Sequence, residues 1–371
     1  MYEELNLREW PFQIVPDENF AKVWAGRQRS KEELERLLRR IILFPKSGIY
    51  VLWANFGMGK THTLLYIKHR CEDNRENLIP IFVVMPKKVN GFIDLYRAIV
   101  QELPFDYLNK QLRELGKGLS EGIALQPMFY KAPGIVNALL AMHSRDIERT
   151  LKAKMWLQGT TGLTSSEMRT IGVINRIKSP EDSLAALNAL IKLALFGNEQ
   201  KRIIFMIDEF QRIGELREKT LSEINSCLRS LYNENPQQIE IILSFSFGKK
   251  ENVDFLLSSE LKSVIQPHSI TLDYLSVTEG KEFLIDLFQN FRIHENNNVT
   301  FPFTSDCIIK LLQYIESKKK ITPRRIMLYA NHALENYMVE KTISAEGIGF
   351  QEIEDYLVDP HLGISDIDNP N

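Results

Sequence analysis

The sequence predicts an α/β fold, in which a parallel sheet carries a helical insertion and is followed by a C-terminal helical domain. Three observations support this prediction. Short apolar runs typical of buried strands recur along the chain, helical periodicity lies between them, and strand signals fade after about residue 276. Strands that alternate with helices are typical of parallel sheets covered on both faces.

Four apolar runs are predicted to be strands. They are short and rich in β-branched and aromatic residues, and they barely alternate with polar residues, as expected when both faces of the sheet are buried. The runs are Ile49–Trp53, Ile79–Met85, Ile203–Ile207 and Ile239–Phe247. Ahead of the first strand, the pattern over Ser30–Ile42 predicts a helix.

More than a hundred residues separate the second strand from the third, far more than one crossover helix needs. We expect helices around 105–118, 126–157 and 181–197, which together form a helical insertion at about 103–200. Three more helices are expected at Val277–Phe291, Ser305–Ser317 and Pro323–Val339. Thr322 is a suitable N-cap for the last of these, and Pro323 suits its first position.

These signals divide the chain into a sheet domain over 1–275, a helical lid domain over 276–350 and an acidic tail over 351–371. The tail lacks Lys and Arg, so we expect a frayed, solvated end.

Composition and charge narrow the classes of protein. Apolar residues make up 44% and charged residues 25% of the chain, which is typical of a soluble globular protein. A formal net charge of −2 excludes a uniformly basic nucleic-acid coat. The three cysteines have no metal-ligand spacing, and no apolar run is long enough to span a membrane. We therefore expect a cytoplasmic protein with no membrane contact.

A glycine-rich segment directly after the first strand predicts a phosphate-binding loop. It reads Ala54-Asn-Phe-Gly-Met-Gly-Lys-Thr and runs into a helix, so backbone N–H groups and the helix N-terminus can surround a phosphate. Lys60 would neutralise the β and γ phosphates, and Thr61 would place its hydroxyl on Mg²⁺. The predicted nucleotide-binding residues of this segment are Asn55, Phe56, Gly57, Met58, Gly59, Lys60, Thr61 and His62. A structural glycine turn with an exposed lysine is the alternative, and Ala54 stands where the strict pattern has glycine.

Two carboxylates, Asp208 and Glu209, follow the third strand directly. They are expected at the carboxyl edge of the sheet, where open α/β sheets bind ligands. Asp208 would hold Mg²⁺, and Glu209 would polarise the water that attacks the γ-phosphate. A polar strand end that caps the next helix is the alternative for this pair.

Other candidate residues lie on the fourth strand and in the helical domain. Ser244 and Ser246 share one face near the strand end, and Ser246 is favoured as a contact of the γ-phosphate or the water. Serines that satisfy local backbone are an equally good interpretation. Arg324 could reach the phosphates, but a solvated basic loop competes with that role.

Together these segments resemble an AAA+ P-loop ATPase of the branch that holds origin-recognition and transposition ATPases. Trp10-Pro11-Phe12 and Trp24-Ala25-Gly26-Arg27 resemble the segments that precede the phosphate-loop strand in that branch, where they shelter the adenine. The segments Leu257–Ser276 and Pro323–Ile326 resemble the approach to the lid and its sensor-2 motif. The resemblance implies that Gly26 and Arg27 bind the nucleotide, Ser246 or Ser244 is sensor 1, and Arg324 is sensor 2.

The resemblance also implies ATP and Mg²⁺ as cofactors, hydrolysis of ATP to ADP and phosphate, and other protein subunits as partners. Lys60, Glu209, Ser246 and Arg324 would be its catalytic residues. Where many relatives carry an arginine that completes a neighbour's active site, this chain has Lys262, whose ammonium lacks the guanidinium fork. A slow or non-hydrolysing nucleotide-gated scaffold is therefore the alternative function, and a small-molecule kinase is a poorer one. A homo-oligomer is compatible with the pattern, although no arginine finger is evident.

The insertion carries a fainter resemblance to ATP-binding proteins of BREX-type phage-defence systems. It rests on Lys154–Gly159 and on Met168–Val173. An α-helical insert whose Trp156 packs in its own small core is the alternative. The resemblance implies a role in phage defence or mobile-element biology.

DNA is a candidate partner because lysines cluster at predicted loops. The clusters are Lys87-Lys88, Lys249-Lys250 and Lys318 to Lys320. Exposed lysines that only keep the surface soluble are the alternative.

Overall fold

The computed structural model contains a five-stranded, fully parallel sheet with the strand order β2-β3-β4-β1-β5. It describes residues 2–15, 17–74, 77–120, 133–198, 200–246, 251–267, 269–344 and 346–357. The strands are β1 (Gly48–Ala54), β2 (Leu78–Val84), β3 (Arg202–Asp208), β4 (Ile239–Ser246) and β5 (Ile270–Leu272). The four predicted strands are confirmed within the described residues, and β5 is too short to give an apolar run.

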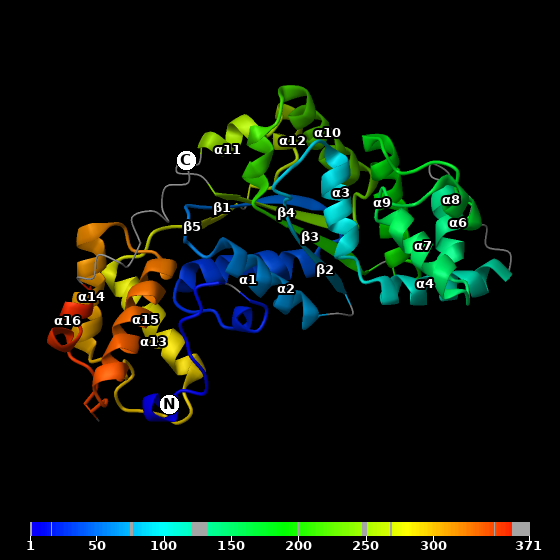
Figure 1. Ribbon diagram of the computed structural model, residues 1–371. Coiled ribbons are helices and arrows are strands. Elements are labelled where there is room, and N and C mark those ends of the chain that lie inside the picture. Colours follow the sequence, from blue (N-terminus) through cyan, green and yellow to red (C-terminus); the bar gives the residue numbers. More distant parts are fainter. Residues whose placement is uncertain are drawn as a thin grey trace.

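Helices cover both faces of the sheet (Figure 1). Alternate residues of each strand point to opposite faces, and apolar side chains on both faces are buried by these helices. On one face α1 and α2 pack on side chains such as Tyr50 and Leu52. On the other face α3, α9 and α10 pack on side chains such as Ile49 and Val51. These helices are α1 (Gln28–Leu43), α2 (Lys60–Glu72), α3 (Phe92–Gln101), α9 (Pro180–Ala194) and α10 (Glu218–Glu234).

The insertion between β2 and β3 is helical, as predicted, and lies beside the sheet (Figure 1). Besides α9 it contains α4 (Phe105–Ser120), α6 (Pro133–Met142), α7 (Ile147–Leu157) and α8 (Ser165–Thr170). α9 packs against α3, α4 and α10, which joins the insertion to the sheet.

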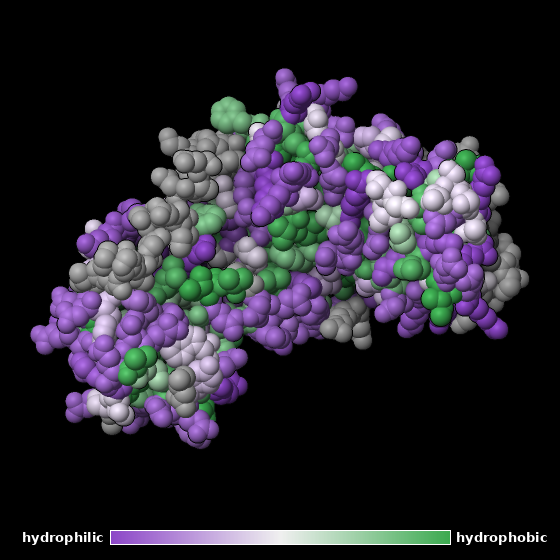
Figure 2. Space-filling model, viewed as in Figure 1, coloured by the Kyte–Doolittle hydropathy of each residue, from purple (hydrophilic) through white to green (hydrophobic). Residues whose placement is uncertain are grey.

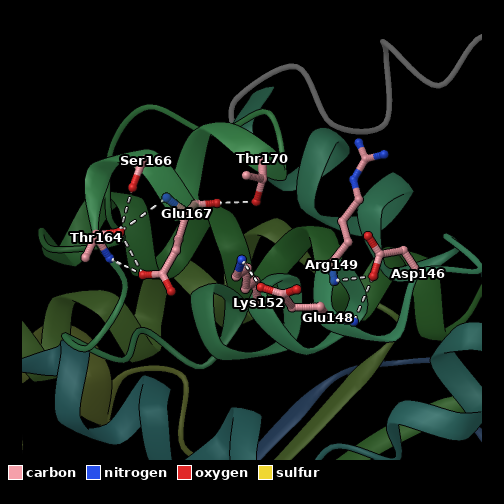
Figure 3. Close-up of polar contacts among 8 residues, drawn as sticks. All are labelled: Asp146, Glu148, Arg149, Lys152, Thr164, Ser166, Glu167 and Thr170. Carbon is pink, nitrogen blue, oxygen red and sulfur yellow. Dashed lines mark hydrogen bonds and ion pairs between the residues drawn. The ribbon is translucent and has the colours of Figure 1, made fainter.

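The prediction of one long helix in the insertion is wrong. The segment predicted as a single helix over 126–157 is broken in the structure between α6 and α7, and residues 126–132 lie outside the described part. Asp146 caps α7 by accepting from the N–H groups of Glu148 and Arg149, and Thr164 caps α8 in a capping box with Glu167 (Figure 3). An N-cap starts a new helix, because its side chain replaces the missing backbone acceptor.

The C-terminal helices form a second core, and the N-terminal segment belongs to it. These helices are α13 (Val277–Phe291), α14 (Ser305–Lys318), α15 (Pro323–Glu340) and α16 (Glu354–Leu357). Leu5, Leu7, Phe12 and Phe20 are buried among their apolar side chains, and the N-terminus lies beside α13 in Figure 1. The proposed boundary at residue 275 stays a prediction.

The beginning of the acidic tail is folded. Ile353 and Leu357 are buried in the second core, so the expectation of a frayed end is wrong for 351–357, and residues 358–371 lie outside the described part. Figure 2 shows polar residues over most of the viewed face, with apolar residues in smaller patches. Among the described residues, no helix is both long and apolar enough to cross a bilayer.

Candidate functional site

The phosphate-loop segment connects β1 to α2 through two glycines in the left-handed region. Gly57 has φ 75° and Gly59 has φ 92°, values that residues with a Cβ rarely adopt. α2 begins directly afterwards at Lys60 and has no acidic residue in its first turn. Its unpaired N–H groups and the positive end of its dipole therefore face the loop, as an anion site requires.

Lys60 is buried beneath this loop, with 6% of its surface exposed, and its Nζ donates to the carbonyl oxygen of Asn55 at 3.0 Å. Burial lowers the pKa of the Lys60 ammonium to about 8, although the charges of Asp208 and Glu209 oppose that effect. The predicted alternative of an exposed lysine on a structural turn is therefore wrong. Asn55 does not line the neighbouring cavity, and its contact with Lys60 is made by its backbone carbonyl.

Thr61 and Asp208 lie together across the sheet. The Thr61 hydroxyl donates to Asp208 Oδ2 at 2.6 Å, and the Ser244 hydroxyl donates to Asp208 Oδ1 at 2.9 Å. β4 lies between β1 and β3, so Ser244 reaches the carboxylate from the intervening strand. This arrangement separates the two serines: Ser244 holds Asp208, whereas the Ser246 hydroxyl is buried at the cavity with no partner among the described residues.

Glu209 lines the same cavity and has an unusual backbone conformation. Its φ is 55°, in the left-handed region, and its N–H donates to Asp208 Oδ1 at 2.9 Å. Its Oε2 accepts from Gln211 Nε2 at 2.9 Å and lies 3.6 Å from the guanidinium of Arg212. Glu209 does not cap a helix with its side chain, which argues against the alternative considered for this pair.

The helical domain meets the phosphate loop through the start of α15. Thr322 caps α15 by accepting from the Arg325 N–H at 3.2 Å, as predicted, and the Arg324 N–H donates to the Gly57 carbonyl at 3.3 Å. The Arg324 guanidinium lies 5.4 Å from the ring centroid of Phe56, within the range of a cation–π contact. Arg324 is therefore beside the loop, and its Nε is buried with no partner among the described residues.

Arg27 connects the loop to the approach of the helical domain. Its guanidinium donates to the Met58 carbonyl at 2.7 Å and to the Asp273 carbonyl at 2.8 Å. Burial lowers its pKa to about 10, and its Nε has no partner among the described residues. Gly26 lies outside the cavity lining: its N–H donates to the Asp286 carboxylate at 2.9 Å, and a Cβ there would meet Phe283 at 3.1 Å.

A cavity of about 230 Å³ lies between the phosphate loop, the N-terminal segment and the helical domain. His62 forms part of its wall: its Nε2 lies 2.8 Å from the Val23 carbonyl, and burial lowers its pKa. Sequence reasoning missed part of the lining, including Gln13, Ile14 and Phe20, and it missed Gln211 beside Glu209. Only the closeness of Gln211 to Glu209 in the chain gave any signal.

The lysines predicted to contact DNA or a neighbouring subunit lie elsewhere. Lys87, Lys88 and Lys318 to Lys320 are exposed, whereas Lys249 and Lys250 fall outside the described residues. Lys262 is exposed and pairs with Asp254 at 3.6 Å. In the insertion, Trp156 is buried and donates to the Asn175 carbonyl, but it packs in the core that the insertion shares with the sheet, so the alternative of a separate small core is wrong.

Comparisons with known proteins identify the class of fold. No protein-family model and no curated protein sequence matches this chain. Solved structures with the same α/β fold, a parallel sheet followed by C-terminal helices, do match, so the predicted fold class is confirmed.

Two of these structures come from Aeropyrum pernix. The ORC1 protein in complex with DNA is 12% identical, with a TM-score of 0.50 over 95% of this chain and 69% of that chain. The ORC2 protein in ADPNP and ADP complexes is 12% identical, with a TM-score of 0.52 over 90% of this chain and 67% of that chain. At such identity the similarity establishes the fold alone.

Proposed function

We propose that this chain is an AAA+ switch that binds ATP with Mg²⁺ between the sheet and the helical lid and hydrolyses it. One observation carries the proposal. The cavity gathers three cations, Lys60, Arg27 and Arg324, around a loop whose helix N-terminus is uncapped by acid. Each of the two guanidinium groups keeps a buried N–H donor, its Nε, without a partner among the described residues. A polyanion such as a triphosphate suits these donors.

The residues beside this cavity fit Mg²⁺. Thr61 and Asp208 offer a hydroxyl and a carboxylate, the oxygen ligands that this ion prefers, and phosphate and water would complete its shell. The bound ion would neutralise charge on the phosphate oxygens. Ser244 fixes the other oxygen of Asp208, which keeps the carboxylate turned toward Thr61.

In the proposed hydrolysis, the residues of the site have different roles. Lys60 and Arg324 hold the charge of the phosphates, because Lys60 is buried at the loop and the Nε of Arg324 is buried beside it. Glu209 accepts the proton of the attacking water through its Oε1. Residues of the helical domain and of the N-terminal segment line the cavity beside these groups.

A nucleotide-gated scaffold that hydrolyses slowly or not at all is the second candidate. It is supported by Lys262, which replaces the arginine of many AAA+ relatives and is paired with Asp254 within the chain. In that case ATP stabilises one lid position, and its hydrolysis is only regulatory.

The context of the switch is also part of the proposal. We also propose that the protein works with partner subunits on DNA and that it acts in phage defence. The exposed lysines support DNA as a partner, and the resemblance of the insertion supports the role in phage defence. The similar ORC1 structure is a complex with DNA, which makes DNA a reasonable partner to test. A cytoplasmic location agrees with this proposal.

Two variants and one rate measurement test the proposal. Lys60→Ala should abolish ATP binding, because it removes a buried cation from the phosphates, whereas Glu209→Gln should bind ATP and slow turnover by roughly 100-fold or more. Single-turnover phosphate release with and without DNA separates the switch from the scaffold. Equal hydrolysis by the Gln variant would remove Glu209 from this role, and ATP binding by Lys60→Ala would overturn the site.

A further inference from the structure

The turn that follows Glu209 is anchored firmly in the sheet core. This 3₁₀ turn, η3 (Phe210–Glu215), buries Phe210 and Ile213 completely. The Phe210 ring packs edge-on against Phe245 of β4, with 5.5 Å between centroids and an interplanar angle of 87°. Since both anchors are fixed, the side chains between them hold defined positions at the tips of β3 and β4.

Gln211 uses both atoms of its amide in this turn. Its Nε2 donates to Glu209 Oε2 at 2.9 Å, and its Oε1 accepts from the Ser246 N–H at 3.0 Å. The carboxylate can only accept and the backbone N–H can only donate, so the two partners fix which way the amide faces.

This bridge replaces a missing strand contact. β3 pairs with β4 only as far as Ile207 and Leu243, so beyond that pair the end of β4 has no strand on the β3 side. The Gln211 amide takes that place for Ser246. On the opposite side, Arg212 donates to the Met85 carbonyl at the end of β2 and faces Glu209 Oε2.

We infer that Gln211 is a positioning residue that ties the carboxylate of Glu209 to the tip of β4. The inference rests on the proposed function and deepens it. Gln211 and Arg212 both engage Oε2, and Glu209 lines the cavity, so Oε1 is the oxygen that we assign to accept the proton of water. Because Ser246 also lines the cavity, a ligand that moves the end of β4 moves Glu209 through one amide.

Two variants separate the two hydrogen bonds. Gln211→Leu removes both, whereas Gln211→Glu keeps an acceptor for Ser246 but places a carboxylate against that of Glu209. Gln313, exposed on α14, supplies the matched controls Gln313→Leu and Gln313→Glu. The readouts are the single-turnover rate of hydrolysis, the Kd of ATP, and hydrogen exchange of the Ser246 amide, which needs no catalysis.

Both Gln211 variants should lower the single-turnover rate about tenfold or more, with the Kd of ATP changed less than about threefold. Exchange at Ser246 should speed up about tenfold or more in Gln211→Leu and stay near the wild-type rate in Gln211→Glu. Rates equal to those of the Gln313 variants, or unchanged Ser246 exchange in Gln211→Leu, would overturn the inference. A wild type that binds ATP without hydrolysing it would overturn the proposed hydrolysis instead, and Ser246 exchange would still decide the bridge.

Discussion

Lys60 is a charged side chain that the fold buries away from water. Its stem is buried under the phosphate loop, and its ammonium donates to a backbone carbonyl. Desolvation outweighs the attraction of Asp208 and Glu209, so the pKa of the ammonium falls from its usual value to about 8. Burying this cation therefore lowers the stability of the protein, as is common at functional sites, and the proposed phosphate ligand would offset that cost.

This balance predicts a pH dependence of ATP binding. The pKa of Lys60 is about 8, and a bound phosphate would favour the protonated form, so ATP binding should take up a proton above that pH. The affinity for ATP should fall as the pH rises from 8 to 9.5, by up to about tenfold per pH unit. Calorimetric titration at several pH values checks this, and a constant affinity over that range would contradict it.

The stability of the ligand-free protein provides the control for that prediction. An unfolded lysine keeps its proton up to a pH of about 10.5, so between 8 and 10.5 the unfolded state binds more protons than the folded state. The contribution of Lys60 to the free energy of unfolding therefore increases with pH in this window. Lys60→Met should remove that increase.

At the scale of elements, the N-terminus of α15 places Arg324 against the phosphate loop. Thr322 is 3% exposed, caps α15, and lies 3.4 Å from where a Cβ on Gly57 would stand. The cap therefore fixes the first turn of α15, and with it Arg324, against the phosphate loop.

Thr322→Ala should reduce both stability and ATP affinity. Loss of an N-cap costs about 1 kcal/mol, and a loosened first turn should weaken ATP binding on the order of threefold to tenfold. Thr164→Ala, which removes the cap of α8 in the insertion, is the matched control, because it should cost similar stability and leave ATP affinity unchanged. Thermal unfolding and titration with ATP measure both. Equal affinities in the two variants would contradict the role of the cap.

The elements also show how far the sequence reaches. Strands and the phosphate loop were predictable because apolar runs and glycines act locally, and Lys60, Thr61 and Asp208 lie together as their motifs predict. The break before α7 was missed because one N-cap, Asp146, outweighs helical periodicity. Ser244 and Ser246 could not be separated by a period of two, since only the position of Asp208 distinguishes them.

For the whole molecule, the important feature is that the two ends of the chain share a core. Leu7 is 1% exposed and pairs with Arg292 directly after α13, and the Arg8 N–H donates to the Phe291 carbonyl at 2.7 Å. Phe20 stacks on Phe291 at 5.0 Å and also lines the cavity. The N-terminal segment therefore connects the second core to the cavity beside the phosphate loop, a long-range contact that no local sequence pattern predicts.

Leu7→Ala tests this arrangement. The truncation should lower the free energy of unfolding of the second core by about 2–5 kcal/mol. Hydrogen exchange should become faster in α13 and α14, while β3 exchanges as before. Leu112→Ala, in the core of the insertion and sheet, should do the reverse and raise exchange in α4 and α9. ATP should slow exchange in both lid helices of the Leu7 variant, since a ligand bound only to the folded site stabilises it by mass action. Equal changes in both cores from either variant would mean that the chain opens as one unit, and the division into two cores would fail.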